Sequence, residues 1–421
     1  MPSDRRPLAI FAAASAAFLL SMFYRVSITV VSPQLATELG LSAAELSVMS
    51  SAFFYVFALV QPGLGAALDR MGPRVLMSGL GLTAAGGALL FALAESGDAL
   101  LLARILMGLG MSANFTGSLM LIMRWFPANR FATLSGALSS LGTLGMTLAS
   151  TPLALLARSL GWRGAFLALA GVTVLQVALF LWVVRNQPSG TESGPRPRPR
   201  GNPFRDLGLL ARRPFFWIMG AATFFRFGAF MAITGLWAGP YLMQGMGLDP
   251  VAAGNMLLAA SLGYILVPPL AGRASDHLLR SRKWVIAPSL LVLAALLALL
   301  ATLDRSTPLP LLAGLFLLLG AASAPGQVIY AHIKELTPPD IAGTALSGAN
   351  LFNMLGPAIL LQAAGLLLPA DLAALGSPEP FARVWLFFAA GVGATGLLYL
   401  LVPESPALRR GLRPAPARPL E

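Results

Sequence analysis

Three arginines, Arg25, Arg104 and Arg226, stand inside long apolar runs of this 421-residue chain. Arg25 follows Tyr24, and Arg226 lies among three phenylalanines. A charge inside an apolar membrane segment costs at least ~2.5–3.5 kcal/mol, so such a residue is a functional candidate by default. The guanidinium group is a planar fork of hydrogen-bond donors that suits a carboxylate or a phosphate. Because no acidic residue stands at comparable depth, Arg25 and Arg226 predict a site for an anion.

Polar side chains accompany these arginines at helical spacing. Ser21, Arg25 and Thr29 recur every four residues, so a helix places them on one face. A polar stripe on an otherwise apolar helix is expected to face a wet cavity rather than lipid. Together with aromatic and amide side chains from other apolar runs, the candidate substrate-binding residues are Arg25, Arg226, Tyr24, Asn114, Trp237, Tyr264, Gln327 and Tyr330.

The sequence also allows structural roles for these residues. Arg25 could pair with backbone carbonyls or extend its guanidinium toward the membrane surface. Arg226 could be a brace that cation–π contacts with the neighbouring phenylalanines hold in place. The tyrosines, Trp237 and Asn114 could be buried residues that pack between helices and whose polar groups form hydrogen bonds within the protein.

The composition argues against several other kinds of site. The chain has no cysteine and only two histidines, so we expect neither disulfides nor a metal centre. No nucleophile–base arrangement is evident, so we expect neither an enzyme nor a cofactor. Proton relays in membranes use buried Asp, Glu or His, and none is visible at mid-depth. Exchange, uniport or charge-driven uptake is therefore favoured over dedicated proton coupling.

The elements that must position the arginines are membrane helices. Hydrophobic residues make up 57% of the chain and charged residues 11%, whereas soluble domains carry roughly 25% charged residues. Apolar runs of about twenty residues are long enough to cross ~30 Å of hydrocarbon as helices. We predict an all-α membrane protein with twelve spans, at 8–33, 43–68, 75–95, 99–123, 131–157, 164–184, 214–242, 251–273, 285–303, 309–332, 342–368 and 382–402.

Basic residues predict the orientation of these spans. Of the 29 lysines and arginines, 22 fall in the segments on the same side as the N-terminus and four in the opposite loops. By the positive-inside rule, both termini are predicted to be cytoplasmic. The same rule accounts for the net charge of +12 without a nucleic-acid partner.

The spans fall into two sets of six. We predict an N-terminal six-helix bundle at 1–184 and a C-terminal one at 214–403. The cytoplasmic linker at 185–213 is polar and proline-rich, which is typical of an extended tether. A basic cytoplasmic tail occupies 404–421.

One charged stretch, from Gly65 to Arg74, repeats in weaker form 207 positions later. Gly65 corresponds to Gly272 and Asp69 to Asp276. An acid at a helix end can meet a neighbouring helix N-terminus or the arginines beside it. We interpret the first copy as a cytoplasmic latch between the two bundles and expect the second copy to be weaker.

The chain resembles the major facilitator superfamily of secondary transporters. That family's loop after the second helix reads Gly-x-x-x-Asp-Arg-x-Gly-x-Arg, and the stretch from Gly65 to Arg74 matches it. The run from Arg104 to Gly110 likewise matches the family's Arg-x-x-x-Gly-x-Gly. The resemblance implies two pseudo-symmetric bundles whose helices one, four, seven and ten line a central path. The candidates for gating or structural roles are Gly65, Asp69, Arg70, Gly72, Arg74, Arg104, Gly108 and Asp276.

The arginines in spans one and seven are similar to those of organic-anion and organophosphate transporters in that family. We predict a monomeric transporter that moves a small organic anion, a carboxylate or an organophosphate, across the bacterial inner membrane by alternating access. Efflux of drugs or metabolites is one alternative, although exporters of cations usually offer a buried acid. A non-transporting receptor or assembly protein is another.

The repeat predicts the relative depth of the two arginines. Shifted by 207 positions, Pro33 corresponds to Pro240 and Arg25 to Ala232. Arg226 then stands six positions, or about 9 Å along a helix, from the place equivalent to Arg25. We therefore expect an asymmetric site, in which one extended anion spans both arginines or the anion visits them in succession.

Overall fold

The structure is a computed structural model that describes residues 6–127, 131–187, 208–338, 341–369 and 376–404. Every regular element within these residues is helical. The elements are α1 (Arg6–Val26), α2 (Ser32–Leu39), α3 (Ala43–Ala92), α4 (Gly97–Met111), α5 (Asn114–Trp125), α6 (Phe131–Leu148), α7 (Thr151–Val183), α9 (Pro214–Ala232), η2 (Ile233–Trp237), α10 (Ala238–Pro240), η3 (Tyr241–Gly245), α11 (Pro250–Arg273), η4 (Ala274–Leu278), α12 (Lys283–Leu300), α13 (Leu309–Ser323), η5 (Ala324–Gly326), α14 (Gln327–Leu336), α15 (Ala342–Leu367) and α16 (Glu379–Tyr399).

The described residues contain enough apolar helix for the predicted twelve crossings. Eleven stretches are long and apolar enough to cross a membrane, and one of them, Leu134–Val183, is 50 residues long. That stretch turns at Gly161, whose φ is +71°, so it provides two crossings. Helix α3 turns in the same way at Gly72, where φ is +78°. A positive φ favours glycine because a Cβ would collide with the backbone.

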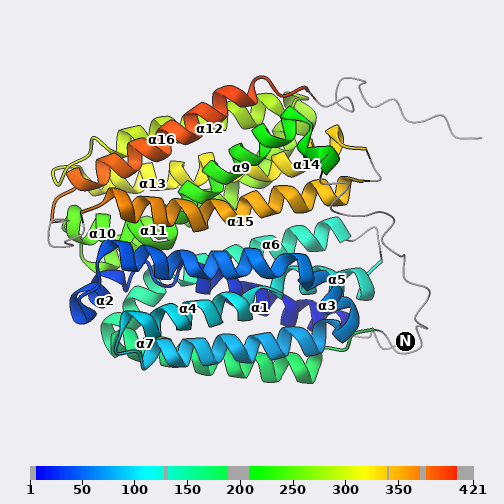
Figure 1. The fold of residues 1–421 in the computed structure, drawn as a ribbon, viewed down its shortest axis with the longest axis horizontal. Coiled ribbons are helices and arrows are strands. Elements are labelled where there is room, and N and C mark those ends of the chain that lie inside the picture. The colour runs from blue at the N-terminus through cyan, green and yellow to red at the C-terminus, as the bar shows by residue number, and fades with distance from the viewer. Residues whose placement is uncertain (1–5, 128–130, 188–207, 339–340, 370–375, 405–421) are drawn as a thin grey trace, which may run out of the picture.

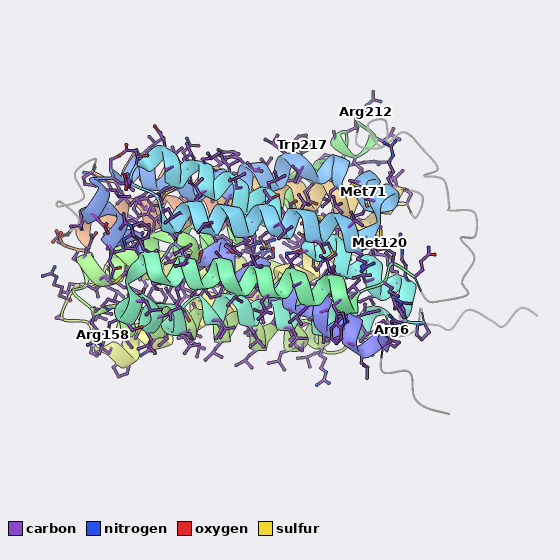
Figure 2. The ribbon with its side chains drawn as sticks, turned by 90° about the horizontal axis from the view of Figure 1, so that it is seen from below. Arg6, Met71, Met120, Arg158, Arg212 and Trp217 are labelled. Atoms are coloured by element: carbon purple, nitrogen blue, oxygen red, sulfur yellow. The ribbon has the colours of Figure 1, made fainter. Side chains whose placement is uncertain are left out.

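The helices form two groups that follow the chain order. Helices α1 to α7 lie on one side of the molecule, and the helices from α9 to α16 lie on the other (Figure 1). Arg6, Met71 and Arg212 lie toward one end of the long axis and Arg158 toward the opposite end (Figure 2). We call these the Arg6 end and the Arg158 end. The charge distribution predicts that the Arg6 end is cytoplasmic.

The 207-residue repeat is visible in the backbone. Shifted by 207, the bounds of α1 become 213–233, and α9 spans Pro214–Ala232. Gly40 and Gly247 are also 207 positions apart, and both adopt a positive φ, of 64° and 77°. The first span of each half therefore starts, breaks and turns at equivalent positions.

Local capping explains where several helices start. The Ser42 hydroxyl accepts a hydrogen bond from the backbone N–H of Glu45, whose carboxylate accepts one from Ser42 in return. This reciprocal capping box satisfies the free N–H groups of the first turn of α3. Asp249 caps α11 in a similar way, immediately before Pro250 at the first helical position.

Five predicted spans are not continuous helices. The span predicted at 8–33 breaks between α1 and α2, the one at 99–123 breaks at 112–113, and the one at 131–157 breaks at 149–150. The span at 214–242 contains the π-helical turns η2 and η3, and the one at 309–332 breaks at η5. In the first break, the hydroxyls of Ser27 and Thr29 donate to the carbonyls of Tyr24 and Val26. Such hydrogen bonds compete with the helical ladder. In the last break, Pro325 cannot donate and Gly326 has little helix preference.

The outer surface of the helices is apolar, as lipid contact requires. Leu59 and Leu366 are 78% and 74% exposed. Trp217, at the Arg6 end (Figure 2), is half-exposed and donates through its indole N–H to the Ala211 carbonyl. Tryptophan is enriched at membrane–water interfaces because its ring is amphipathic. The Arg6 end therefore carries a membrane-interface anchor.

Within the described residues, the hydrogen bonds that join the two groups of helices lie between mid-depth and the Arg158 end. Among the described residues, three hydrogen bonds join them. Thr29 donates to the Thr234 carbonyl over 2.6 Å, Tyr55 to Gln362 over 3.0 Å, and Thr151 to Asn255 over 2.8 Å. Gly239 lies so close to Thr29 that an added Cβ would stand 1.9 Å from its carbonyl oxygen.

Candidate functional site

Arg25 is buried where the two groups of helices meet. It lies in the last turn of α1 and is 6% exposed. Its carbonyl oxygen faces Gly235 of η2, and its guanidinium carbon lies 4.7 Å from the ring centroid of Phe57. Within the described part of the chain, no group accepts a hydrogen bond from its guanidinium, and its Nε is fully buried. Arg25 therefore keeps its donors available.

Arg104 is buried as deeply but is engaged. It is 0% exposed, and its Nη1 donates to the Tyr24 carbonyl over 2.9 Å. That carbonyl belongs to the last turn of α1, where backbone oxygens lack helical partners and the helix dipole is negative. Phe53 covers the guanidinium at 4.9 Å. Arg104 thus caps the broken first helix, in keeping with the structural role expected of it.

Arg226 is engaged in the same manner in the second half. It is 1% exposed, and its Nη1 donates over 2.6 Å to the carbonyl of Ser323, the last residue of α13. A Cβ at Gly326 would stand 1.9 Å from the guanidinium carbon, so only glycine leaves room for the arginine there. Phe227 contributes a more distant cation–π contact of 5.8 Å. Arg226 caps the break in the tenth span.

No carboxylate among the described side chains neutralises these arginines. Among the side chains that the structure describes, no aspartate or glutamate is buried. The negative helix ends partly compensate Arg104 and Arg226, because each donates directly to a terminal carbonyl. The guanidinium of Arg25 has no such contact, so its charge is the least compensated of the three.

Two of the predicted tyrosines lie near these arginines. Tyr264 of α11 packs beside α13, where a Cβ at Gly320 would stand 3.0 Å from the Tyr264 backbone nitrogen. Tyr330 of α14 follows the break at η5 that Arg226 caps. The ring of Tyr264 stacks on Phe230 at 4.8 Å. Neither phenol has a hydrogen-bond partner among the described residues, whereas the hydroxyls of the other four tyrosines each bond to a protein group. Tyr264 and Tyr330 therefore lie beside the break that Arg226 caps, and their hydroxyls are free within the described residues.

The remaining predicted site residues pack between helices. The Tyr24 hydroxyl pairs with Thr173 over 2.8 Å inside the first half. The Asn114 amide donates to the Ala17 carbonyl over 3.0 Å, and the Trp237 indole to the Leu361 carbonyl over 3.4 Å. The structure gives these three side chains packing partners and no contact with the arginines. The side chain of Gln327 lies outside the described residues.

Sequence reasoning did not identify Phe57 or Gly326, which hold two of the arginines. Phe57 has no distinguishing signal, because it is one of 24 phenylalanines in an apolar chain. Gly326 could have been found, since Pro325-Gly326 in the middle of an apolar span indicates a helix break. The carbonyls that Arg104 and Arg226 bind carry no sequence signal.

The motif residues that are described form contacts within their own half. Arg74 donates through Nη2 to the Leu181 carbonyl over 2.7 Å, and its N–H donates to Asn186. Gly72 provides the turn, and a Cβ there would collide with Asn186. A Cβ at Gly65 would meet nothing within 4 Å, so no helix packs closely against this glycine in this conformation. The Asp69 side chain is outside the described residues.

The other motif residues also serve one half each. Gly108 packs against the backbone of Phe53, where a Cβ would stand 2.6 Å from the carbonyl oxygen. Arg70 is exposed. Asp276 forms an ion pair with Arg282, which also pairs with Glu335 over 2.7 Å. In the described residues, therefore, no motif side chain reaches across to the other half.

The chain is similar to several transporters and to a protein named as a transcription regulator. It is 26% identical over 171 residues to the probable sulfoacetate transporter SauU of Cupriavidus necator, a match that spans 41% of this chain and only 40% of that protein. It is 30% identical over 355 residues, 82% of each chain, to the transcription regulatory protein OpdE of Pseudomonas aeruginosa. It is 24% identical to the hexuronate transporter of Bacillus subtilis over 85% of this chain and 87% of that one.

Solved structures and a family model agree on the fold. The inward-facing, unoccupied form of a bacterial homolog of the human lysosomal transporter Spinster superposes with a TM-score of 0.75 at 18% identity, covering 98% of this chain and 100% of that one. The model of the Major Facilitator Superfamily matches residues 13–254 and 227–421. The family match, the relatives above and the two groups of membrane helices together show that the chain belongs to the Major Facilitator Superfamily of multi-pass membrane transporters.

Proposed function

We propose that this protein transports a small organic anion across the bacterial inner membrane and that Arg25 is its anion ligand. One observation carries the proposal: a buried guanidinium at the meeting of the two halves has no carboxylate beside it and no hydrogen-bond acceptor among the described residues. A buried charge is costly unless it is paired. An anionic substrate would supply the missing partner through two parallel hydrogen bonds.

The contacts between the halves support transport by alternating access. The three hydrogen bonds that join the halves lie between mid-depth and the Arg158 end, and the described motif residues at the Arg6 end bind within their own halves. This distribution is expected of a state that is closed toward the Arg158 end. The opposite state would break the Thr29–Thr234 contact and engage the predicted latch at the Arg6 end.

The named relatives favour an anion. Sulfoacetate and hexuronates are both organic acids, and the chain resembles transporters named for them. An exporter of lipophilic cations would be expected to offer a buried carboxylate, and the described residues bury none.

Uptake into liposomes tests this function. The purified protein is reconstituted, and uptake of radiolabelled carboxylates, sulfonates and organophosphates is compared with that of lipophilic cations. We expect saturable uptake of at least one anion above the level of protein-free liposomes. Saturable movement of cations with none of the anions would refute the proposal.

A second candidate is a sensor that binds an anion without moving it. The similarity to a protein named as a transcription regulator over 82% of each chain favours it. Calorimetric binding of an anion to the purified protein, combined with no flux of that anion in liposomes, would support the sensor. Flux that saturates near the measured binding constant supports the transporter.

A further inference from the structure

The buried arginines differ in whether the guanidinium is hydrogen-bonded at all. Arg104 and Arg226 each donate through Nη1 to a carbonyl at a broken helix end, although Nε and Nη2 of Arg104 and Nε of Arg226 are buried without a partner in the described residues. Arg25, Tyr264 and Tyr330 have no hydrogen-bond partner among the described residues. We propose that the site takes a singly charged, hydroxylated anion, with Arg25 as its one charged ligand. Arg226 is then a positioning residue. This inference rests on the proposed function and specifies its substrate class.

Arg226 has no room for a second anionic group. Its Nη1 is bonded to the Ser323 carbonyl, and the backbone of Gly326 lies against its guanidinium carbon, Nε and Nη2. A carboxylate that took the Nη1 donor would leave a buried carbonyl unsatisfied, which is unfavourable. The contact also holds the tenth span at its break, where Tyr330 begins the second turn of α14.

Arg104 is equally unsuited to bind substrate. It is fully buried, with Phe53 over its guanidinium and the Tyr24 carbonyl on its Nη1. A ligand would have to displace the end of α1, which also carries Arg25. A second carboxylate would therefore enter the site without a cation to pair with it, and burying an unpaired charge is strongly unfavourable.

The two free phenols fit hydroxyl groups of a substrate. A phenol both donates and accepts a hydrogen bond, so it complements an alcohol. It cannot neutralise a carboxylate. The ring of Tyr264 stacks on Phe230, five residues before Gly235, which faces the Arg25 carbonyl. Tyr330 follows the break that Arg226 caps. A hydroxylated carbon chain anchored at Arg25 would therefore pass along these two residues.

Pairs of sugar acids that differ at one end of the chain test the inference. An aldonate and an aldarate with the same number of carbons, three, four or six, share the inner hydroxylated carbons, and the terminal CH2OH of the aldonate is replaced by a second carboxylate in the aldarate. Each acid competes for uptake of the best labelled anion in liposomes. We expect the aldonate to inhibit at least ten-fold more strongly than its matched aldarate. Equal or stronger inhibition by the aldarates would overturn the inference and leave anion transport itself intact.

Variants separate a positioning role of Arg226 from a binding role. Arg226→Lys should lower the maximal uptake rate of both acids and leave the aldonate-to-aldarate preference unchanged. Gly326→Ala should do the same, because the methyl group would displace the guanidinium. A loss confined to aldarates in Arg226→Lys would show that Arg226 binds the second carboxylate.

The tyrosines have their own matched test. Tyr264→Phe and Tyr330→Phe each remove one hydroxyl and keep the ring. Each should weaken inhibition by the six-carbon aldonate several-fold and leave inhibition by hexanoate, which has no hydroxyls, unchanged. An equal effect on both acids would contradict the role of the phenols. Failure of every anion to enter the liposomes would instead refute the proposed function.

Discussion

The two halves of the molecule solve the same structural problem with arginines from different helices. In the first half, Arg104 on the fourth span caps the break in the first span. In the second half, Arg226 on the seventh span caps the break in the tenth. The donor and acceptor spans are exchanged between the halves. A buried arginine in this protein is therefore no sign of a ligand site by itself, and its hydrogen-bond partner decides its role.

Arg25 is the exception in this comparison, and its removal is expected to have the largest effect on transport. Arg25→Ala should reduce anion uptake by roughly 30-fold or more, because losing one partner of a buried charge pair costs about 2–5 kcal/mol. Arg25→Lys should retain part of the uptake, since it keeps the charge and loses the planar fork. Uptake of the labelled anion in liposomes, at equal protein content, is the measurement. Normal uptake in Arg25→Ala would contradict the assignment.

The capping arginines should show the opposite pattern, with a larger effect on stability. Arg104→Ala and Arg226→Ala each remove a charged hydrogen bond to a helix end and should lower the free energy of unfolding by about 1.5–3 kcal/mol. Arg25→Ala, which breaks no hydrogen bond in the described residues, is the matched control and should leave it nearly unchanged. Melting temperatures from thermal unfolding in detergent rank the stabilities of the three variants. A lower melting temperature for Arg25→Ala than for the other two would break the comparison.

The contact between the first spans of the two halves can be tested with glycine variants. Gly239→Ala would place a methyl carbon 1.9 Å from the Thr29 carbonyl oxygen, which is a clash. Gly235→Ala is the control, because its methyl carbon would stand 3.7 Å from the Arg25 carbonyl oxygen, an ordinary contact distance. We therefore expect Gly239→Ala to favour the state open at the Arg158 end.

Labelling of a single cysteine measures this shift. The chain has no cysteine of its own, and Ser32 is fully buried near this contact. A Ser32→Cys thiol should react several-fold faster with a polar maleimide in the Gly239→Ala background than in Gly235→Ala. Equal rates would show that this contact does not close the Arg158 end.

The smallest expected effect is on the pH dependence of stability, which we expect to involve a loop of the first half and not the corresponding loop of the second. In the first half, the indole of Trp162 and then the guanidinium of Arg163 hold the pKa of the Glu38 carboxyl below its usual 4.5. In the second half, Arg305 donates to the carbonyls of Gly245 and Gln244, which do not titrate.

A carboxyl whose pKa is lower in the folded state stabilises the fold above its ordinary pKa, and this contribution is lost as the pH falls through the lowered value. Glu38→Gln should therefore reduce the fall in melting temperature below pH 4.5. Because Glu38 is largely exposed, the change should be small and should shrink in high salt. Arg305→Lys should not alter that pH dependence. A pH profile of melting temperatures for the three proteins is the measurement, and identical acid slopes for wild type and Glu38→Gln would contradict it.

Much of the architecture follows from patterns that sequence records directly. Runs of apolar residues predict the crossings, and the repeat that relates Gly40 to Gly247 predicts the equivalent helix ends. The breaks in the spans were missed because apolar length does not distinguish a continuous helix from two halves joined by Ser27–Thr29 or Pro325-Gly326. Backbone carbonyls are the acceptors for Arg104 and Arg226, and every residue carries one, so no sequence pattern marks them. The free and the engaged arginines therefore look alike in the sequence.

The π-helical turns of the seventh span have a mechanical consequence. A π turn holds one residue more than an α turn, so η2 and η3 give this span spare length on either side of Pro240. Converting either turn to α-helix would rotate the residues beyond it by about 100° around the axis. The Thr234 carbonyl, which receives the hydrogen bond from Thr29, lies within η2. The seventh span can therefore release its neighbour by a screw motion, without tilting as a rigid rod.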